Sequence, residues 1–199
     1  MSNNKTIFDV YRQTQTYTDK YDLGYLQYFY SDYLKECKSE INNFLEIGVS
    51  LGGSMKLWRA FFDEQVDVVG VDVQELIRIE GCTIIKADAY CTDYVDTIPN
   101  DHYDLIVDDG GHTFEQWMKL IDLYFDKIPV GGRIIIEDVI PPFEAGKGAN
   151  ESQRELMKEA IRDKGYSYMQ IHDLTGKQQT TKLQELWKDL GIEIWELRK

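Results

Sequence analysis

Acidic residues lie at the ends of five successive apolar segments of this chain, where carboxylates can bind a cation or accept hydrogen bonds from a ligand. The segments are short and rich in valine and isoleucine, which favours buried strands. The acids are Glu46, Asp72 and Asp88, then Asp108 with Asp109, and Glu137 with Asp138. In an open α/β sheet, ligands bind in the crevice beyond the carboxyl ends of the strands. We therefore expect the functional site at this edge of the predicted sheet.

The turn after the first segment matches two motifs with different chemistry. Gly48-Val-Ser-Leu-Gly52 is a literal G-x-S-x-G between a predicted strand and a predicted helix, as in the nucleophile elbow of a hydrolase. Ser50 would then be the nucleophile, with Asp138 and His172 following in hydrolase order. However, the elbow normally follows several strands, and no His-Gly oxyanion segment precedes this turn. A serine hydrolase is therefore the weaker alternative.

The same turn also has the pattern Glu46-x-Gly48-x-x-x-Gly52, which differs from the G-x-G-x-x-G of nicotinamide-binding and flavin-binding proteins. Glycine suits such a turn because it lacks Cβ and tolerates positive φ. Asp72 ends the next segment about twenty residues later, where an acid can accept hydrogen bonds from ribose hydroxyls. We therefore treat the glycine turn and Asp72 as parts of one candidate site at the carboxyl ends of the strands.

Short apolar strands that alternate with helices predict a parallel sheet covered on both faces. We expect strands at 43–47, 66–72, 82–88, 103–108 and 131–138, and helices at 54–62 and 113–127. A helix at 151–164 has Asn150 as N-cap and Gly165 as its stop. The alternating segments 166–172 and 192–197 suit edge strands, as an antiparallel pair, with a short helix at 182–190 between them. The fold class is thus a three-layer α/β/α, Rossmann-like domain with a mostly parallel seven-stranded sheet.

The whole chain, 1–199, is expected to form a single domain, in which residues 1–40 are an N-terminal helical cap segment. Within this segment, apolar residues recur at a spacing of three and four, which is typical of one face of a helix. They are Leu26, Phe29, Tyr30, Tyr33 and Leu34.

Composition restricts the partners. The chain has 22 basic and 35 acidic residues, a net charge of −13, and no cluster of lysine and arginine. Because nucleic-acid binding depends on basic side chains at phosphates, no nucleic-acid partner is expected. Without a signal peptide or an apolar run of about 18 residues, we expect no membrane partner and a cytoplasmic location. Three cysteines without C-x-x-C spacing suit reduced thiols, and the sequence leaves room for a homo-oligomer.

The glycine turn and the two acids after it resemble the first motifs of class I S-adenosylmethionine (SAM)-dependent methyltransferases. The resemblance implies that SAM is the cofactor and that its amino-acid part lies at the turn, its ribose at Asp72 and its adenine at Asp88. Asp108 would face the ammonium group of the cofactor. The cofactor-binding residues are then Glu46, Gly48, Ser50, Gly52, Asp72, Val73, Asp88, Ala89 and Asp108.

A closer resemblance lies in Val107-Asp-Asp-Gly-Gly-His112. It is similar to the D-D-G-S-H segment of the metal-dependent sugar O-methyltransferases of macrolide biosynthesis, the mycinamicin 2''-O-methyltransferase type, with Gly111 in place of serine. Three further segments agree with this group. They are Thr18-Asp-Lys20 with Gly24-Tyr25 and Tyr28, Gly52-Gly-Ser54 with Leu57-Trp58, and Gly131-Gly132 with Ile136-Glu-Asp138. The resemblance covers roughly residues 17 to 140.

This second resemblance implies SAM-dependent, metal-assisted O-methylation of a hydroxyl on a sugar or other small carbohydrate-like acceptor. It assigns a divalent cation to Asp109, Glu137 and Asp138, and carboxylate oxygens suit Mg²⁺ or another hard ion. Adjacent strand residues point to opposite faces, so Glu137 and Asp138 can share an ion only if the strand ends or bends there. His112 would be the general base. A SAM-binding protein without turnover is the alternative within this fold, because Gly111 and the segment 140–148 differ from the group.

Overall fold

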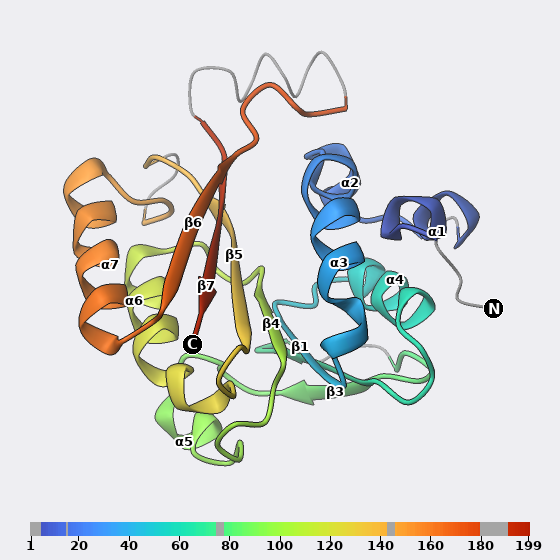
Figure 1. Cartoon of the computed structure of the whole chain (residues 1–199), viewed down its shortest axis with the longest axis horizontal. Coiled ribbons are helices and arrows are strands. Elements are labelled where there is room, and N and C mark those ends of the chain that lie inside the picture. Colours follow the sequence, from blue (N-terminus) through green and yellow to red (C-terminus); the bar gives the residue numbers. More distant parts are fainter. Residues whose placement is uncertain (1–4, 15, 75–77, 143–145, 180–190) are drawn as a thin grey trace.

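The computed structural model describes residues 5–14, 16–74, 78–142, 146–179 and 191–199 (Figure 1). Its centre is a seven-stranded sheet in the order β3-β2-β1-β4-β5-β7-β6. The strands are β1 (Asn43–Ile47), β2 (Asp67–Asp72), β3 (Thr83–Lys86), β4 (Leu105–Asp108), β5 (Arg133–Val139), β6 (Tyr168–Asp173) and β7 (Glu193–Arg198). Strands β1 to β5 are parallel, and β7 is antiparallel to both β5 and β6. The predicted fold class, a Rossmann-like mostly parallel sheet between helices, is confirmed.

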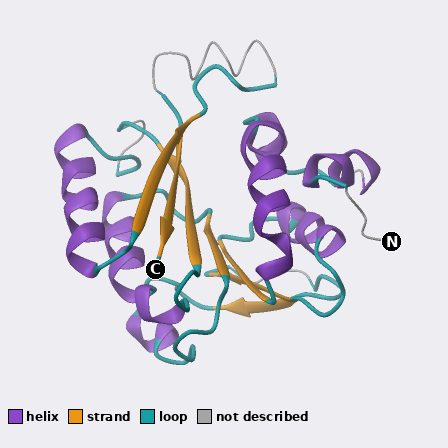
Figure 2. Cartoon of the chain, viewed as in Figure 1, coloured by secondary structure: helices purple, strands orange, loops and turns teal. Residues whose placement is uncertain are grey.

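Helices cover both faces of the sheet (Figure 2). They are α1 (Ile7–Thr14), α2 (Asp19–Asp22), the π-helix η1 (Leu26–Tyr30), α3 (Ser31–Cys37), η2 (Lys38–Glu40), α4 (Gly53–Phe61), α5 (Thr92–Val95), α6 (Phe114–Leu123), η3 (Phe125–Lys127) and α7 (Glu151–Lys164). As predicted, α7 is capped by Asn150 and ends at Gly165, which has a φ of 98°. The predicted helix at 182–190 lies outside the described residues, and among the described helices none is long and apolar enough to cross a membrane.

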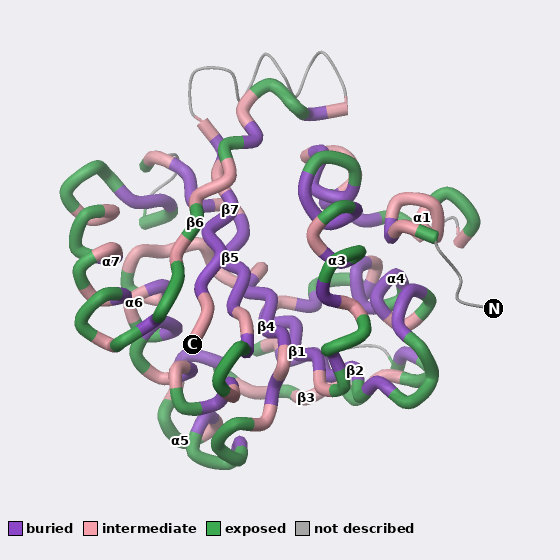
Figure 3. Tube along the Cα trace, in the orientation of Figure 1, coloured by how far each residue is buried: buried purple, intermediate pink, exposed green. Residues whose placement is uncertain are grey.

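The prediction of two edge strands at the C-terminal end is wrong for one of them. Only β6 is an edge, because β7 lies between β5 and β6 and its four central residues are buried (Figure 3). The alternation that suggests an exposed face comes from Glu193 and Glu196. Glu196 is nevertheless buried, and its carboxylate is paired with His172 at 3.4 Å and Arg198 at 2.7 Å. A buried strand that contains paired charged residues can therefore have the same sequence pattern as a strand with an exposed face.

Successive residues of each central strand belong to two different cores. On β1, Phe44 packs in the core under α1, η1, α3 and α4, whereas Leu45 packs in the core under α5, α6 and α7. Glu46 follows Phe44 by two residues, so it points towards the N-terminal helices. The same alternation places Glu137 on β5 on the side of the N-terminal helical segment, where Lys20 and Tyr30 bind it.

Candidate active site

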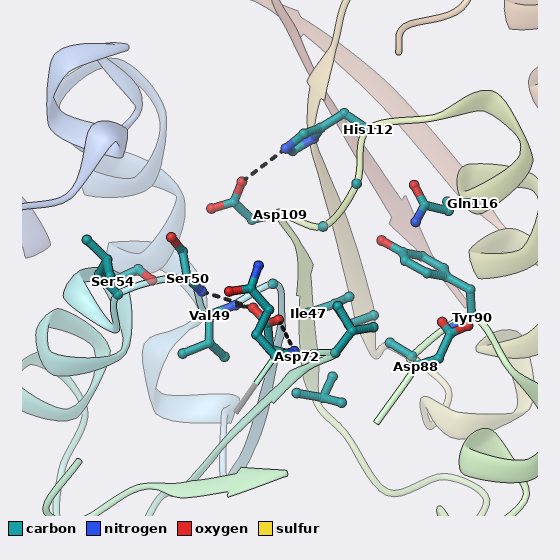
Figure 4. A pocket seen from close by; sticks show the side chains of 18 of the residues that line it. Ile47, Val49, Ser50, Ser54, Asp72, Asp88, Tyr90, Asp109, His112 and Gln116 are labelled. Atoms are coloured by element: carbon teal, nitrogen blue, oxygen red, sulfur yellow. Dashed lines mark hydrogen bonds and ion pairs between the residues drawn. The ribbon is translucent and has the colours of Figure 1, made fainter. Parts of the chain in front are cut away.

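A cavity of about 670 Å³ lies at the carboxyl ends of β1, β2 and β4 (Figure 4). Six of the nine predicted cofactor-binding residues line it: Gly48, Ser50, Asp72, Val73, Asp88 and Ala89. Tyr90, Asp109, His112 and Gln116 line it as well. The structure therefore brings most of the glycine turn, the acids after β2 and β3, and the loop after β4 around one space.

The glycine turn approaches the loop after β4 very closely. Gly48 has a φ of 86°, and a Cβ built on it would lie 2.0 Å from the carbonyl oxygen of Asp109. Gly52, the N-cap of α4, has a φ of 76°. Only glycine fits both demands at position 48, because a side chain would collide with backbone as well as strain the turn. The absence of a side chain at Gly48 thus allows the backbone of Asp109 to lie close against the glycine turn.

Asp72 fastens the same turn from the end of β2. Its Oδ2 accepts hydrogen bonds from the N–H groups of Val49 at 2.9 Å and Ser50 at 3.0 Å, and its Oδ1 accepts one from Gln74 at 2.9 Å. Partial burial favours the neutral acid, but these backbone donors outweigh it and lower the pKa of Asp72. The ionised carboxylate has about four acceptor positions, so capacity for ligand hydroxyls remains.

Two acids predicted to bind the cofactor lie behind the wall of the cavity instead. Glu46 is fully buried and accepts hydrogen bonds from Ser54 Oγ at 2.7 Å and Trp58 Nε1 at 2.9 Å. Asp108 is buried beneath Tyr90, whose hydroxyl donates to its Oδ1 at 2.5 Å. Burial raises the pKa of Asp108 to about 6. In this structure the two acids position α4 and Tyr90, and do not themselves line the cavity.

Lys20, the last residue of the Thr18-Asp-Lys20 motif, lies in the site although no role is predicted for it. Its side chain is 1% exposed, and its Nζ lies 2.5 Å from Asp109 Oδ2, 2.5 Å from Glu137 Oε2 and 3.4 Å from Glu46 Oε1. Burial alone would lower the pKa of Lys20, but the three carboxylates raise it well above its usual value. The ammonium is therefore charged and lies between β1, β4 and β5.

Glu137 is bound on both oxygens by the N-terminal helical segment. Lys20 donates to its Oε2, and the Tyr30 hydroxyl donates to its Oε1. The side chain is 1% exposed, and burial raises the pKa of Glu137 well above its usual value. Glu137 is predicted to be a metal ligand. In the structure its carboxylate is instead bound by Lys20 and Tyr30 and does not line the cavity.

The side chain of Asp138 points away from that of Glu137, because β5 bends near its end. A cation shared by these two residues would require such a bend. The pairing register with β7 shifts between Ile136 and Val139, and Asp138 has a φ of 54°. His112 also has a left-handed φ, 55°. Such conformations cost free energy in non-glycine residues and cluster at functional sites. Both strained residues turn their side chains to the same point.

The carboxylates of Asp109 and Asp138 meet the His112 ring at that point. His112 Nε2 lies 3.7 Å from Asp109 Oδ1 and 3.7 Å from Asp138 Oδ2, and the three ligand atoms lie within 4.8 Å of one another. Burial raises the pKa of Asp109 to about 7; nearby Lys20 acts against this shift and Asp138 adds to it. Two carboxylate oxygens and a ring nitrogen that converge in this way form a donor set that fits a divalent cation.

The structure does not assemble the residues of the alternative hydrolase. Ser50 lines the cavity, but His172 lies on β6, 3.4 Å from Glu196 and in ring contact with Phe29. Asp138 pairs with Tyr25 and faces His112. A nucleophile, a base and an orienting acid must share hydrogen bonds, and these three residues do not.

No protein-family profile matches the sequence. Among curated proteins, the mycinamicin VI 2''-O-methyltransferase of Micromonospora griseorubida is 25% identical over an alignment of 146 residues, and the match covers 66% of this chain and 36% of that protein. The L-olivosyl-oleandolide 3-O-methyltransferase of Streptomyces antibioticus is 25% identical over 136 residues, 63% of this chain and 35% of that protein. These matches span little more than a third of the length of the curated relatives.

Solved structures give the same indication. The MycE methyltransferase from the mycinamycin biosynthetic pathway, in complex with Mg, SAH and mycinamycin VI, aligns with 100% of this chain and 55% of its own, at a TM-score of 0.71 and 19% identity. An O-methyltransferase from Bacillus cereus in complex with SAH aligns with 97% of this chain and 89% of its own, at a TM-score of 0.59 and 12% identity. The resemblance that the sequence motifs indicate is confirmed, and the fold is that of the class I methyltransferases.

Proposed function

We propose that this chain, which has the class I methyltransferase fold and resembles macrolide O-methyltransferases in sequence, is a SAM-dependent O-methyltransferase. The proposed acceptor is a hydroxyl of a sugar or another small carbohydrate-like molecule, and the proposed metal is Mg²⁺ or another hard divalent cation. One observation carries the proposal. The carboxylates of Asp109 and Asp138 converge with His112, and Asp109 and His112 line the cavity that the glycine turn and Asp72 also line.

The cavity residues suit SAM in a definite arrangement. The glycine turn would leave backbone open to the amino-acid part, the ionised Asp72 would accept hydrogen bonds from ribose hydroxyls, and Asp88 with Ala89 would lie beside the adenine. The sulfonium of SAM supplies an already activated methyl group, so this chain needs only to orient the hydroxyl and remove its proton. No covalent enzyme intermediate is required.

We assign the two chemical tasks at the acceptor to three residues. Asp109 and Asp138 would hold the cation through the oxygens that face His112, and a bound cation lowers the pKa of a hydroxyl that it contacts. Because Mg²⁺ prefers oxygen ligands, His112 Nε2 is left free to accept that proton. We leave Glu137 out of the proposed ligand set, since both its oxygens already accept hydrogen bonds.

Calorimetric titration with S-adenosylhomocysteine, followed by transfer assays with labelled SAM and a panel of nucleotide sugars and glycosylated acceptors, tests this function. We expect cofactor binding and cation-stimulated transfer to at least one acceptor. Cofactor binding without transfer to any acceptor would favour the alternative of a SAM-binding protein without turnover. Absence of cofactor binding would reject both.

Replacing Asp72 with asparagine should weaken S-adenosylhomocysteine binding about tenfold to a hundredfold, because charge-assisted hydrogen bonds contribute about 1.5–3 kcal/mol. Asparagine has the same shape but only one acceptor oxygen, so it cannot serve both the turn and the ribose. Calorimetry measures the affinity. Asp67→Asn at the exposed start of the same strand is the matched control and should bind normally. Equal affinities for the two variants would contradict the ribose assignment.

A further inference from the structure

Two buried tyrosines of the N-terminal helical segment bind two consecutive carboxylates of β5. The Tyr25 hydroxyl donates to Asp138 Oδ1, and the Tyr30 hydroxyl donates to Glu137 Oε1. Both tyrosine side chains are completely buried. Asp138 faces His112, whereas Glu137 faces Lys20. The two hydroxyls therefore bind carboxylates that lie in different environments.

The π-helix η1 brings these tyrosines to one side of the segment. In an α-helix, residues five apart point in clearly different directions, whereas a π-helix closes its hydrogen bonds over five residues. The Leu26 carbonyl at its start accepts both the backbone N–H and, at 2.6 Å, the hydroxyl of Ser31. Single π turns occur frequently at functional sites. Here the turn allows Tyr25 and Tyr30 to meet the bent end of β5 together.

The hydrogen bond from Tyr25 fixes the orientation of Asp138. With Oδ1 bound to the hydroxyl, the remaining oxygen, Oδ2, is the one that lies 3.7 Å from His112 Nε2. Lys20 orients Asp109 in a similar way. Its Nζ donates to Asp109 Oδ2, and Asp109 Oδ1 lies 3.7 Å from His112 Nε2. Each carboxylate thus offers one oxygen to the shared point and has the other one held from behind.

We propose that Tyr25 is a positioning residue of the cation site, which holds Asp138 in the orientation that binds the metal. This inference rests on the proposed function only in so far as Asp109 and Asp138 bind a divalent cation. Hydrogen-bond partners of metal-binding carboxylates commonly contribute tenfold to a hundredfold to metal affinity. The left-handed backbone of Asp138 makes such a partner more necessary, because the strained residue needs surroundings that hold it in place.

Mn²⁺ binding to the whole chain, without SAM or acceptor, tests the inference through Tyr25→Phe. Phenylalanine keeps the ring and the net charge, and removes only the hydroxyl. We expect the dissociation constant for Mn²⁺, measured by calorimetry and by the free-Mn²⁺ electron paramagnetic resonance signal, to rise about tenfold to a hundredfold. Tyr30→Phe is the matched control: it loses the same buried hydroxyl one carboxylate away, and its Mn²⁺ affinity should stay within about twofold of the wild type.

The rise in melting temperature on adding Mn²⁺ gives a second measurement that a lower basal stability does not obscure, because it reports binding to the folded chain. A smaller rise in Tyr25→Phe than in Tyr30→Phe supports the inference. Equal losses of affinity in the two variants would overturn it and return Glu137 to the ligand set. Unchanged affinity in Tyr25→Phe would overturn it while leaving the cation site intact. If the wild type fails to bind Mn²⁺, the cation part of the proposed function fails as well.

Discussion

Lys20→Met is expected to lower the free energy of unfolding by about 3–5 kcal/mol, the usual loss when one partner of a buried ion pair is removed. Methionine fills a similar volume, but it leaves Glu46, Asp109 and Glu137 without their common cation. Because folded domains are stable by only about 5–15 kcal/mol, much of the variant should be unfolded at moderate temperature. Urea unfolding followed by circular dichroism measures the loss.

The double variant Lys20→Met/Glu137→Gln separates charge from packing. Neutralising Glu137 removes one of the uncompensated charges, so part of the lost stability should return.

Lowering the pH should also reduce the loss of stability in Lys20→Met. Lys20 acts against the burial that raises the pKa of Asp109 and Glu137, so removing Lys20 raises both pKa values further, and the folded variant binds more protons than the folded wild type. The loss should therefore be smaller at about pH 5 than at about pH 8. A loss that is independent of Glu137 and of pH would mean that Lys20 acts through packing alone.

His112→Asn is expected to slow methyl transfer by about a hundredfold to ten-thousandfold, the usual contribution of a general base. Asparagine is chosen because His112 has a φ of 55°, a conformation that asparagine tolerates better than most residues. The affinities for S-adenosylhomocysteine and Mn²⁺ should stay close to those of the wild type, because neither role is assigned to this ring. Single-turnover transfer with labelled SAM, together with calorimetry, measures the three quantities.

His172→Asn is the matched control for this variant. His172 pairs with Glu196 and packs against Phe29, and it does not line the cavity, so transfer should continue at nearly the wild-type rate. If His112→Asn instead loses Mn²⁺ affinity in parallel with transfer, Nε2 is a third metal ligand and another group must remove the proton. The three ligand atoms lie close enough for this outcome to be a real alternative.

The sequence predicts the strands of the sheet well because their signals are local. The first strand is found at the predicted residues, 43–47, and β2 to β5 deviate by a few residues at their ends. The helix at 151–164 also agrees, since its capping residues Asn150 and Gly165 make their contacts within a few positions of the chain. The prediction fails for β7 as an edge strand, because the pairing of Glu196 with His172 depends on a neighbouring strand.

The site is predicted in part, and the missing residues share a physical reason. Asp109, Asp138 and His112 follow from their places after β4 and near the end of β5. Lys20 lies 89 positions from Asp109 and 117 from Glu137, and nothing in its local sequence indicates a buried ion pair. In the sequence, Tyr30 is one of the apolar residues of a predicted helix face, and Tyr25 is only part of the Gly24-Tyr25 motif. The π-helix η1 brings both hydroxyls to β5, and no local sequence pattern predicts this π-helix.

What the sequence by itself determines is the set of groups at one edge of the sheet, because strand periodicity and glycine turns are encoded within a few neighbouring residues. The tertiary structure decides which carboxylate oxygens remain available to a ligand. Glu46 and Glu137 point into the core beneath the N-terminal helices and are held there by Lys20, Trp58 and Tyr30. Asp109 and Asp138 each have one oxygen held from behind and the other turned towards His112. Burial makes the difference, since a carboxylate removed from water must be matched by a donor, and the donors come from a distant part of the chain.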